Sequence, residues 1–377
     1  MEELRYSNGK LRRCGYTTGS CASAAAAAAA ILLLSGQAPE AVTIQLPRGK
    51  TLILEPIECA MEGNAACCAI RKFSGDDPDI TDGILVYARV EKTDAGIHID
   101  GGVGVGRVTK PGLDQPVGNA AINSGPRSQI TENVCSVARK YGYTGGFHIL
   151  ISVPEGEELA RRTFNPKLGI VGGISILGTS GIVEPMSSAA LTESLRAEIS
   201  VLAHGGQKNM LLVLGNYGRD FAEEALGLDC KNSIMCSNLI GDALSAAVEQ
   251  QFQKVLLVGH IGKLVKLGIG QTNTHSNQGD GRMEILSACA VRAGADLETV
   301  QKILDCATTD AALNLLGPFL ESTLAILQEK INETLLRFVR SETKVEWVCF
   351  TKENGVPRVL MQSVGAEAFE ELWRIGK

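Results

Sequence analysis

The stretch "RRCGYTTGSCASAAAAAAAILLLSG", residues 12–36, allows two incompatible interpretations. Two arginines ahead of an apolar run are typical of a secretory signal peptide. However, a polar segment with two glycines, residues 15–20, separates the charges from the apolar run. That run is mostly alanine, which forms helices well, and it is shorter than the roughly 20 apolar residues that a bilayer requires. We therefore predict a closely packed helix of a folded domain, capped by Thr18 or Ser20.

The composition of the chain restricts its class. Its 377 residues predict two or three domains, and a net charge of −6 with no basic run excludes a general nucleic-acid binder. The 11 cysteines show no C-x-x-C spacing of a zinc site and no regular disulfide framework. They are interpreted as reduced core residues, which favours a cytoplasmic protein, and no later run reaches transmembrane length.

The two halves of the chain have different patterns. In the first half, strands are expected at 42–46, 51–56, 66–73, 84–91 and 146–153, with a helix at 128–141. They do not alternate regularly, which predicts a mixed α+β domain over residues 1–162.

The second half alternates more regularly. Apolar strands are expected at 210–214, 254–259 and 345–350, between helices at 191–203, 237–252 and within 282–340. This alternation predicts an α/β domain with a largely parallel sheet over residues 163–377.

Two nucleotide-binding motifs are excluded. The glycine run at 102–107 has Arg107 where G-x-G-x-x-G requires its last glycine. Gly49-Lys50-Thr51 has Ile44 where a P-loop requires glycine. A kinase or dehydrogenase with a standard phosphate loop is therefore not expected.

Two glycine-containing loops, 215–218 and 258–264, directly follow predicted strands. In an open parallel sheet such loops line one ligand crevice, and here they would bring in His260 and Lys263. A third segment, 273–282, places polar side chains at the start of a predicted helix, and the N-terminus of a helix binds anions favourably. For Asp280, capping of that helix is the alternative role.

The segment 163–185 combines glycines, hydroxyls and Glu184 around an apolar strand. It predicts backbone amides that meet a polar ligand, with a closely packed core strand as the alternative. Basic residues concentrate in the glycine-flanked loops, which indicates an anionic substrate: they are Lys110, Arg127, Lys167, Lys263, Lys266 and Arg282.

Several longer strings occur together and in order. They are GYTTG at 15–19 with Cys21-Ala22, DDPDITDG at 76–83, VTKPGL at 108–113, residues 163–185, GNYG at 215–218, SNLIG at 237–241, residues 258–266 and THS at 274–276. Over residues 11–286 the chain resembles the CbiD family, the cobalt-precorrin-5B C1-methyltransferases of anaerobic cobalamin biosynthesis. It departs from the family pattern at Ser20, where threonine is common, and at Ser124-Gly125, where Pro-Val is expected before Pro126-Arg127.

This resemblance implies S-adenosylmethionine as methyl donor and an anionic cobalt-corrinoid intermediate as acceptor. Cobalt then belongs to the substrate, so no metal site of the protein is expected. C1 of the macrocycle would attack the sulfonium methyl group, and the base that removes a proton would be His260, His275 or Asp280. A non-catalytic protein that binds or carries a corrinoid precursor is the alternative. An oligomer and contacts with neighbouring pathway enzymes are both compatible with the sequence.

The resemblance also implies two sets of binding residues. The set expected to bind the carboxylates of the substrate is Thr17, Thr18, Ser20, Lys110, Arg127, Lys263 and Arg282. The set expected to hold the donor is Gly172, Gly173, Gly178, Thr179, Glu184, Asn216 and Tyr217.

Overall fold

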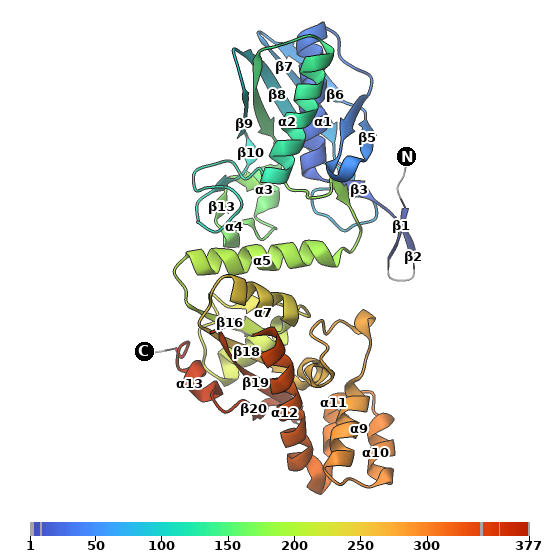
Figure 1. Ribbon diagram of the computed structural model, residues 1–377, viewed down its shortest axis with the longest axis vertical. Helices are drawn as coiled ribbons and strands as arrows, with labels where there is room; N and C mark the ends of the chain where they lie inside the picture. Colours follow the sequence, from blue (N-terminus) through green and yellow to red (C-terminus); the bar gives the residue numbers. More distant parts are fainter. Residues whose placement is uncertain (1–3, 8–9, 340–341, 354, 376–377) are drawn as a thin grey trace. The chain divides into compact units, whose positions relative to one another are not determined.

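The computed structural model describes residues 4–7, 10–339, 342–353 and 355–375, and the chain divides into two units, Met1–Ala189 and Ala190–Lys377 (Figure 1). The division falls after the expected boundary at 162, because short strands in the segment 163–185 pair with strands of unit 1. These pairs are β13 (Ile170–Val171) with β11 (Arg107–Val108), β14 (Gly173–Ile174) with β10 (Gly104–Val105), and β15 (Ile182–Val183) with β3 (Gly15–Tyr16).

Unit 1 is built on a mixed sheet covered by two helices (Figure 1). In spatial order its strands are β6 (Ile57–Glu62), β7 (Ala65–Arg71), β8 (Leu85–Thr93), β12 (Gly146–Ser152) and β9 (Ile97–Gly101). Neighbouring strands are antiparallel except β12 and β9, which are parallel. The covering helices are α1 (Thr18–Ser35) and α2 (Ser124–Lys140). The predicted α+β class is thereby confirmed.

Shorter elements complete unit 1. They are the hairpins β1 (Leu4–Ser7) with β2 (Lys10–Arg13) and β4 (Val42–Gln45) with β5 (Thr51–Leu54), and the helices α3 (Gly156–Ala160) and α4 (Asn165–Leu168).

Helix α1 forms the centre of the unit 1 core. Its N-cap is Thr17, whose Oγ1 accepts a hydrogen bond from the Ser20 amide at 3.2 Å. The expected cap, Thr18 or Ser20, was wrong by at least one residue, because the helix already includes both. Within the described residues, α1 alone is long and apolar enough for a membrane span, yet 78% of it is buried inside the fold. Every residue from Thr18 to Ala30 is buried, as expected of a core helix.

Helices α1 and α2 approach closely because alanine fills most of their contact. Four buried polar side chains are exceptions. Ser23 Oγ donates to the Gln129 carbonyl at 3.1 Å, and Asn133 Nδ2 donates to Ser23 Oγ at 3.1 Å. Gln129 Nε2 also donates to Ser20 Oγ at 3.3 Å. A polar ladder, formed by Ser20, Ser23, Gln129 and Asn133, therefore runs along this helix contact.

The glycines at 101–106 serve close packing of the backbone. A Cβ added at Gly104, whose φ is +71°, would lie 1.7 Å from the Val153 carbonyl oxygen. A Cβ at Gly173 would lie 2.1 Å from the Gly104 carbonyl oxygen. These two positions need glycine because their neighbours are backbone atoms that cannot move aside.

Unit 2 is a doubly wound α/β domain. Its sheet has the spatial order β17 (Ile234–Met235), β16 (Asn209–Val213), β18 (Lys254–His260), β19 (Lys344–Glu353) and β20 (Val356–Gln362). The first four strands are parallel, and β20 is antiparallel to β19. Alternate residues enter two separate cores, Leu257 on one face and Leu256 on the other, so both faces are covered. The predicted parallel sheet is confirmed.

The helices of unit 2 contribute to two cores, one on each face of this sheet, and those between residues 282 and 315 (orange in Figure 1) group to one side of it. Those that contribute to the larger core are α5 (Ser188–His204), α7 (Ile240–Glu249), α8 (Ile261–Leu264), α9 (Arg282–Arg292), α10 (Leu297–Leu304), α11 (Thr309–Leu315) and α12 (Leu320–Phe338). The smaller core contains residues of the segment Phe221–Ala225 and of α13 (Ala366–Glu370). Helix α6 (Gly215–Asp220) directly follows β16.

Candidate functional site

The strand order of unit 2 reverses between β16 and β18, since β17 lies on one side of β16 and β18 on the other. In open α/β sheets the ligand crevice lies beyond the carboxyl ends of the strands at this reversal. The loops that follow β16 and β18 meet there: a Cβ added at Gly215 would lie 3.7 Å from Lys263 Nζ. We call this group of strand ends the switch-point crevice, after the ligand crevice that is expected there.

Lys263 brings a positive charge to the switch-point crevice. Its Nζ donates to the carbonyl oxygen of Ser237, just after β17, at 3.0 Å. Burial lowers the pKa of Lys263. Ser237 has φ +53°, a left-handed conformation that is uncommon for a residue other than glycine. The ends of three neighbouring strands are therefore joined around one ammonium group.

His260, at the end of β18, has both ring nitrogens engaged. Nδ1 accepts a hydrogen bond from the Gly262 amide at 3.1 Å and thereby caps α8. Nε2 lies 3.4 Å from Asp310 Oδ1. Because Nδ1 accepts, the proton of the neutral ring sits on Nε2 and points to the carboxylate. Burial lowers the pKa of His260, and Asp310 partly opposes that shift.

Asp310 connects the ends of two strands. Besides facing His260, its Oδ1 accepts from the Thr351 hydroxyl and, at 3.3 Å, from the Lys352 amide. No sequence pattern predicts this role, because an aspartate in the first turn of a helix ordinarily indicates capping and Asp310 is 50 residues from His260 in the chain. Only the fold brings Asp310 to the edge of the sheet.

The loop between β18 and α9 is held by a buried lysine. Lys266 Nζ donates to the carbonyls of Thr274, at 3.2 Å, and Gly279, at 3.0 Å. Arg282 pairs with Asp280 at 2.6 Å, and its hydrogen bonds lower the pKa of Asp280 to about 2. A carboxylate with so low a pKa accepts protons poorly near neutral pH.

His275 lies exposed in the same loop. Its Nδ1 accepts from the Asn277 amide at 3.1 Å. In the part of the chain that the structure describes, no hydrogen bond engages its Nε2. Among the three candidate bases, His275 therefore keeps a ring nitrogen available.

Asn216 and Tyr217 lie exposed on α6 beside the switch-point crevice. Tyr217 is 67% exposed, and Lys352 Nζ lies 4.4 Å from the centre of its ring. Both side chains are available to a ligand, and the tyrosine ring already binds one cation on its face.

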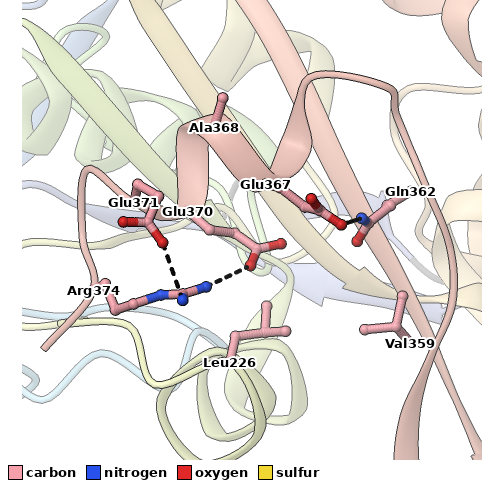
Figure 2. A pocket seen from close by; sticks show the side chains of 8 residues that line it. All are labelled: Leu226, Val359, Gln362, Glu367, Ala368, Glu370, Glu371 and Arg374. Carbon is pink, nitrogen blue, oxygen red and sulfur yellow. Dashed lines mark hydrogen bonds and ion pairs between the residues drawn. The ribbon is translucent and has the colours of Figure 1, made fainter.

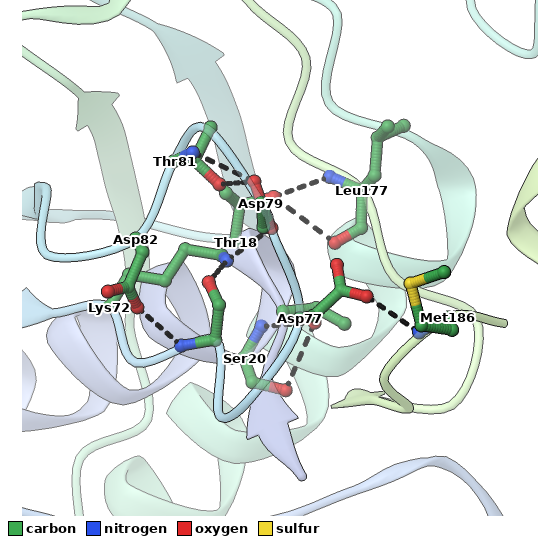
Figure 3. Close-up of polar contacts among 11 residues, drawn as sticks. Thr18, Ser20, Lys72, Asp77, Asp79, Thr81, Asp82, Leu177 and Met186 are labelled. Atoms are coloured by element: carbon green, nitrogen blue, oxygen red, sulfur yellow. Dashed lines mark hydrogen bonds and ion pairs between the residues drawn. The ribbon is translucent and has the colours of Figure 1, made fainter. Parts of the chain in front are cut away.

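In unit 1, the hydroxyls expected to bind substrate hold the start of α1 to the loop 177–181 (Figure 3). Thr18 Oγ1 donates to the Leu177 carbonyl at 3.3 Å and accepts from its amide at 2.9 Å. Ser20 Oγ donates to the Gly181 carbonyl at 2.8 Å and has no exposed surface. The Leu177 carbonyl also accepts the Gly19 amide at 2.9 Å. A ligand could reach Ser20 only if this loop moved, so direct binding does not fit its burial.

The aspartates of the DDPDITDG string are each engaged within unit 1, and Figure 3 shows Asp77, Asp79 and Asp82. Lys72, 2% exposed, donates through Nζ to Asp79 and to Ser74 Oγ, both at 2.6 Å. The other three partners are Arg13 for Asp76, the Met186 amide for Asp77 and the Ser74 amide for Asp82. The string therefore braces the core, and no group of three metal-ligating side chains occurs among the described residues.

The other predicted residues of unit 1 have separate surroundings. Lys110 Nζ donates to the Lys167 carbonyl at 3.2 Å, and Arg127 donates to the carbonyls of Ile122 and Ile99, both at 2.8 Å. Gly173 packs against the backbone of Gly104, and Gly178 packs against the Thr17 side chain. Gly172 and Thr179 are exposed, and Glu184 pairs with Arg5 at 3.1 Å. The expected donor loops, 172–184 and 215–218, belong to different units.

A pocket of about 450 Å³ lies elsewhere in unit 2 (Figure 2). None of the predicted site residues lines it. Its charged groups engage one another, since Arg374 pairs with Glu371 at 3.0 Å and with Glu370 at 3.7 Å. The geometry therefore favours the switch-point crevice over this pocket.

Comparisons with known proteins agree with the sequence resemblance. Residues 5–185 match the family model described as CbiD, and residues 273–358 match that of the CbiD C-terminal domain. A cobalt-precorrin-5B C(1)-methyltransferase of Ruminiclostridium cellulolyticum is 46% identical over 94% of this chain and 93% of its own length. One from Thermoanaerobacter sp. is 44% identical, over 94% and 97% of the two chains. A crystal structure of a cobalamin biosynthesis protein (cbiD) from Archaeoglobus fulgidus is 31% identical, covering 73% of this chain and 86% of that one with a TM-score of 0.40.

Proposed function

Because the chain belongs to the CbiD family, we propose that it transfers a methyl group from S-adenosylmethionine to C1 of cobalt-precorrin-5B, giving cobalt-precorrin-6A in anaerobic cobalamin biosynthesis. The observation that carries this proposal is the identity of 43–46% to methyltransferases of that name over more than nine-tenths of this chain. The reaction takes place in the cytoplasm, where the reduced cysteines of the chain are stable.

The switch-point crevice fits the donor by its chemistry. It offers a glycine in left-handed conformation, Gly215, beside the exposed side chains of Asn216 and Tyr217 and the ammonium of Lys263. These groups suit the polar parts of S-adenosylmethionine, which when bound supplies an electrophilic methyl group. Cobalt enters as part of the substrate, so the protein needs no metal ligands of its own.

The residues of the chain have two tasks in this reaction. They align C1 with the methyl group and exclude water, and they accept the proton that the macrocycle loses. His275 performs the second task, because His260 has both nitrogens engaged and the pairing with Arg282 makes Asp280 a weak proton acceptor. His275→Gln is expected to lower the rate of methyl transfer about 10²- to 10⁴-fold with the affinity for either substrate unchanged, in a single-turnover assay. An unchanged rate would remove His275 from the reaction.

The direct test is an anaerobic incubation of the purified chain with cobalt-precorrin-5B and methyl-labelled S-adenosylmethionine, followed by mass spectrometry. One labelled methyl group located at C1 is the expected product. Tight binding of the macrocycle without transfer would instead support a carrier protein. Failure to bind either compound, with the chain folded, would overturn the proposed function.

A further inference from the structure

Lys263 is a half-buried cation without a counter-charge. Among the residues that the structure describes, no carboxylate lies within ion-pair distance of its Nζ, and its one hydrogen bond goes to a backbone carbonyl. The Cys236 thiol nearby does not supply a negative charge, because complete burial raises the pKa of Cys236 to about 12. A partly desolvated charge without a partner is unfavourable, and a bound anion would remove that penalty.

The backbone around Lys263 brings no side chain against one side of its ammonium. Gly215 has φ +74°, and a Cβ added there would meet only Lys263 Nζ, at 3.7 Å, so the absence of a side chain at Gly215 leaves that side of the ammonium uncovered. Ser237, whose carbonyl oxygen binds the ammonium, is also left-handed. A left-handed residue other than glycine, beside an ammonium at the point where the strand order reverses, is the kind of backbone strain that occurs at ligand sites.

The number of charges indicates the kind of anion. Of the other cations at this edge, Lys266 is used by two backbone carbonyls and Lys352 lies over the Tyr217 ring. A single ammonium, a point charge with three donors, suits one carboxylate. Both proposed co-substrates carry carboxylates: S-adenosylmethionine in its amino-acid portion, and the macrocycle in its acetate and propionate side chains.

We propose that Lys263 binds a carboxylate of one of the two co-substrates in the switch-point crevice. This inference rests on the proposed function, because that function supplies the two ligands. Lys263 acts through binding and performs no chemical step, so its loss is expected in affinity more than in the rate of methyl transfer from the saturated enzyme.

The test compares Lys263→Met with Lys263→Arg, with Lys231→Met as the control for loss of an exposed lysine in the same unit. Equilibrium binding to the full chain is measured for S-adenosylmethionine, for decarboxylated S-adenosylmethionine and, anaerobically, for cobalt-precorrin-5B. Lys263→Met is expected to weaken binding of one carboxylate-bearing ligand about 10- to 100-fold, the effect of one hydrogen bond to a charged group. Lys263→Arg is expected to retain most of the affinity, and Lys231→Met all of it.

The three ligands identify the source of the carboxylate. If it belongs to the donor, the decarboxylated donor binds the wild type and Lys263→Met alike; if it belongs to the macrocycle, only the affinity for cobalt-precorrin-5B falls. Equal affinity of Lys263→Met and wild type for all three ligands would overturn the proposal. If Lys263→Met does not fold, the wild type alone tests the proposal. The proposal would be overturned if the wild type bound S-adenosylmethionine and its decarboxylated form equally well and if its affinity for cobalt-precorrin-5B did not depend on salt concentration. A Lys263 effect without methyl transfer by the wild type would overturn the proposed function alone.

Discussion

Replacing Asp310 by asparagine tests whether one carboxylate holds the end of β18 in place. In the wild type this carboxylate accepts from the Thr351 hydroxyl and the Lys352 amide and faces His260 Nε2 at 3.4 Å. The asparagine amide that replaces it keeps the shape of the side chain but loses the charge. His260→Gln would be less informative, because it removes the reporting ring itself.

The expected size of the effect follows from these contacts. A hydrogen bond to a charged group contributes about 1.5–3 kcal/mol and a neutral one about 0.5–1.5 kcal/mol, so each bond weakens by about 1 kcal/mol. The Lys352 bond is long, at 3.3 Å, and the Asp310 side chain is 32% exposed, which screens the charge. Asp310→Asn should therefore lower the free energy of unfolding of unit 2 by about 1–2 kcal/mol.

The pKa of His260 should fall in the same variant, because the carboxylate that favours the charged ring is gone. Burial already places the folded-state pKa of His260 below the ordinary value of about 6.5. The unfolded chain thus takes up a proton at higher pH than the folded chain does. The His260 contribution to stability is fully present above about pH 6.5 and is lost as the pH falls through the folded-state pKa. In Asp310→Asn the folded-state pKa of His260 is lower still, so the loss of stability extends to lower pH than in the wild type.

Two measurements check this prediction. Urea unfolding at several pH values gives the free energy of unfolding, and NMR of ¹⁵N-histidine-labelled protein gives the tautomer and pKa of His260. Asp305→Asn, at an exposed aspartate of the same unit, is the matched control. A His260 pKa that rises, or a change in the free energy of unfolding below about 0.5 kcal/mol, would refute the reasoning.

Three further variants test other parts of the structure. Lys72→Met leaves Asp79 partly buried without its counter-charge and should lower the free energy of unfolding, measured in urea, by about 3 kcal/mol. Adding Asp79→Asn to this variant should restore part of the loss, and equal stability of the single and the double variant would contradict this reasoning. Gly104→Ala places a methyl group 1.7 Å from the Val153 carbonyl oxygen and should abolish folding of unit 1, seen as loss of soluble protein; a stable variant would show that this contact can relax. Asp280→Asn should change the rate of methyl transfer less than about tenfold, because an aspartate with a pKa of about 2 is not the base; a loss of 10² or more would return Asp280 to the candidates.

The regular parts of the fold could be predicted because they depend on local patterns. The apolar runs at 210–214 and 254–259 became β16 and β18, and the strand order brought together the loops at Gly215 and Lys263. Strand β20 was not predictable, because its residues include a proline and most are exposed on an edge. Ser237, expected in a helix, instead ends the segment after β17 in a left-handed conformation.

The features that could not be predicted depend on contacts distant in sequence. The segment 163–185 joins unit 1 through strands of two residues each, too short for any periodicity. Asp310 and Lys72 find their partners through the tertiary fold, and a lysine in a strand pattern gives no sign that it is buried. The roles of individual side chains are least visible in sequence for the same reason: Ser20 belongs to a string that resembles the family, yet its surface is fully covered.

The polar ladder between α1 and α2 has a consequence for how unit 1 reaches a single native arrangement. Helix α1 is rich in alanine and buried on all sides from Thr18 to Ala30, so its surface there is nearly uniform around the axis and hydrophobic burial barely favours one rotation over another. Ser23, Gln129 and Asn133 form their hydrogen bonds across the helix contact at one rotation and one axial offset only. Those few bonds therefore discriminate between helix pairings of almost equal apolar burial. Replacing the polar side chains of the ladder with alanine would keep unit 1 compact but allow more than one arrangement of α1 and α2. The Thr17–Ser20 turn would then no longer have one fixed position against the 177–181 loop.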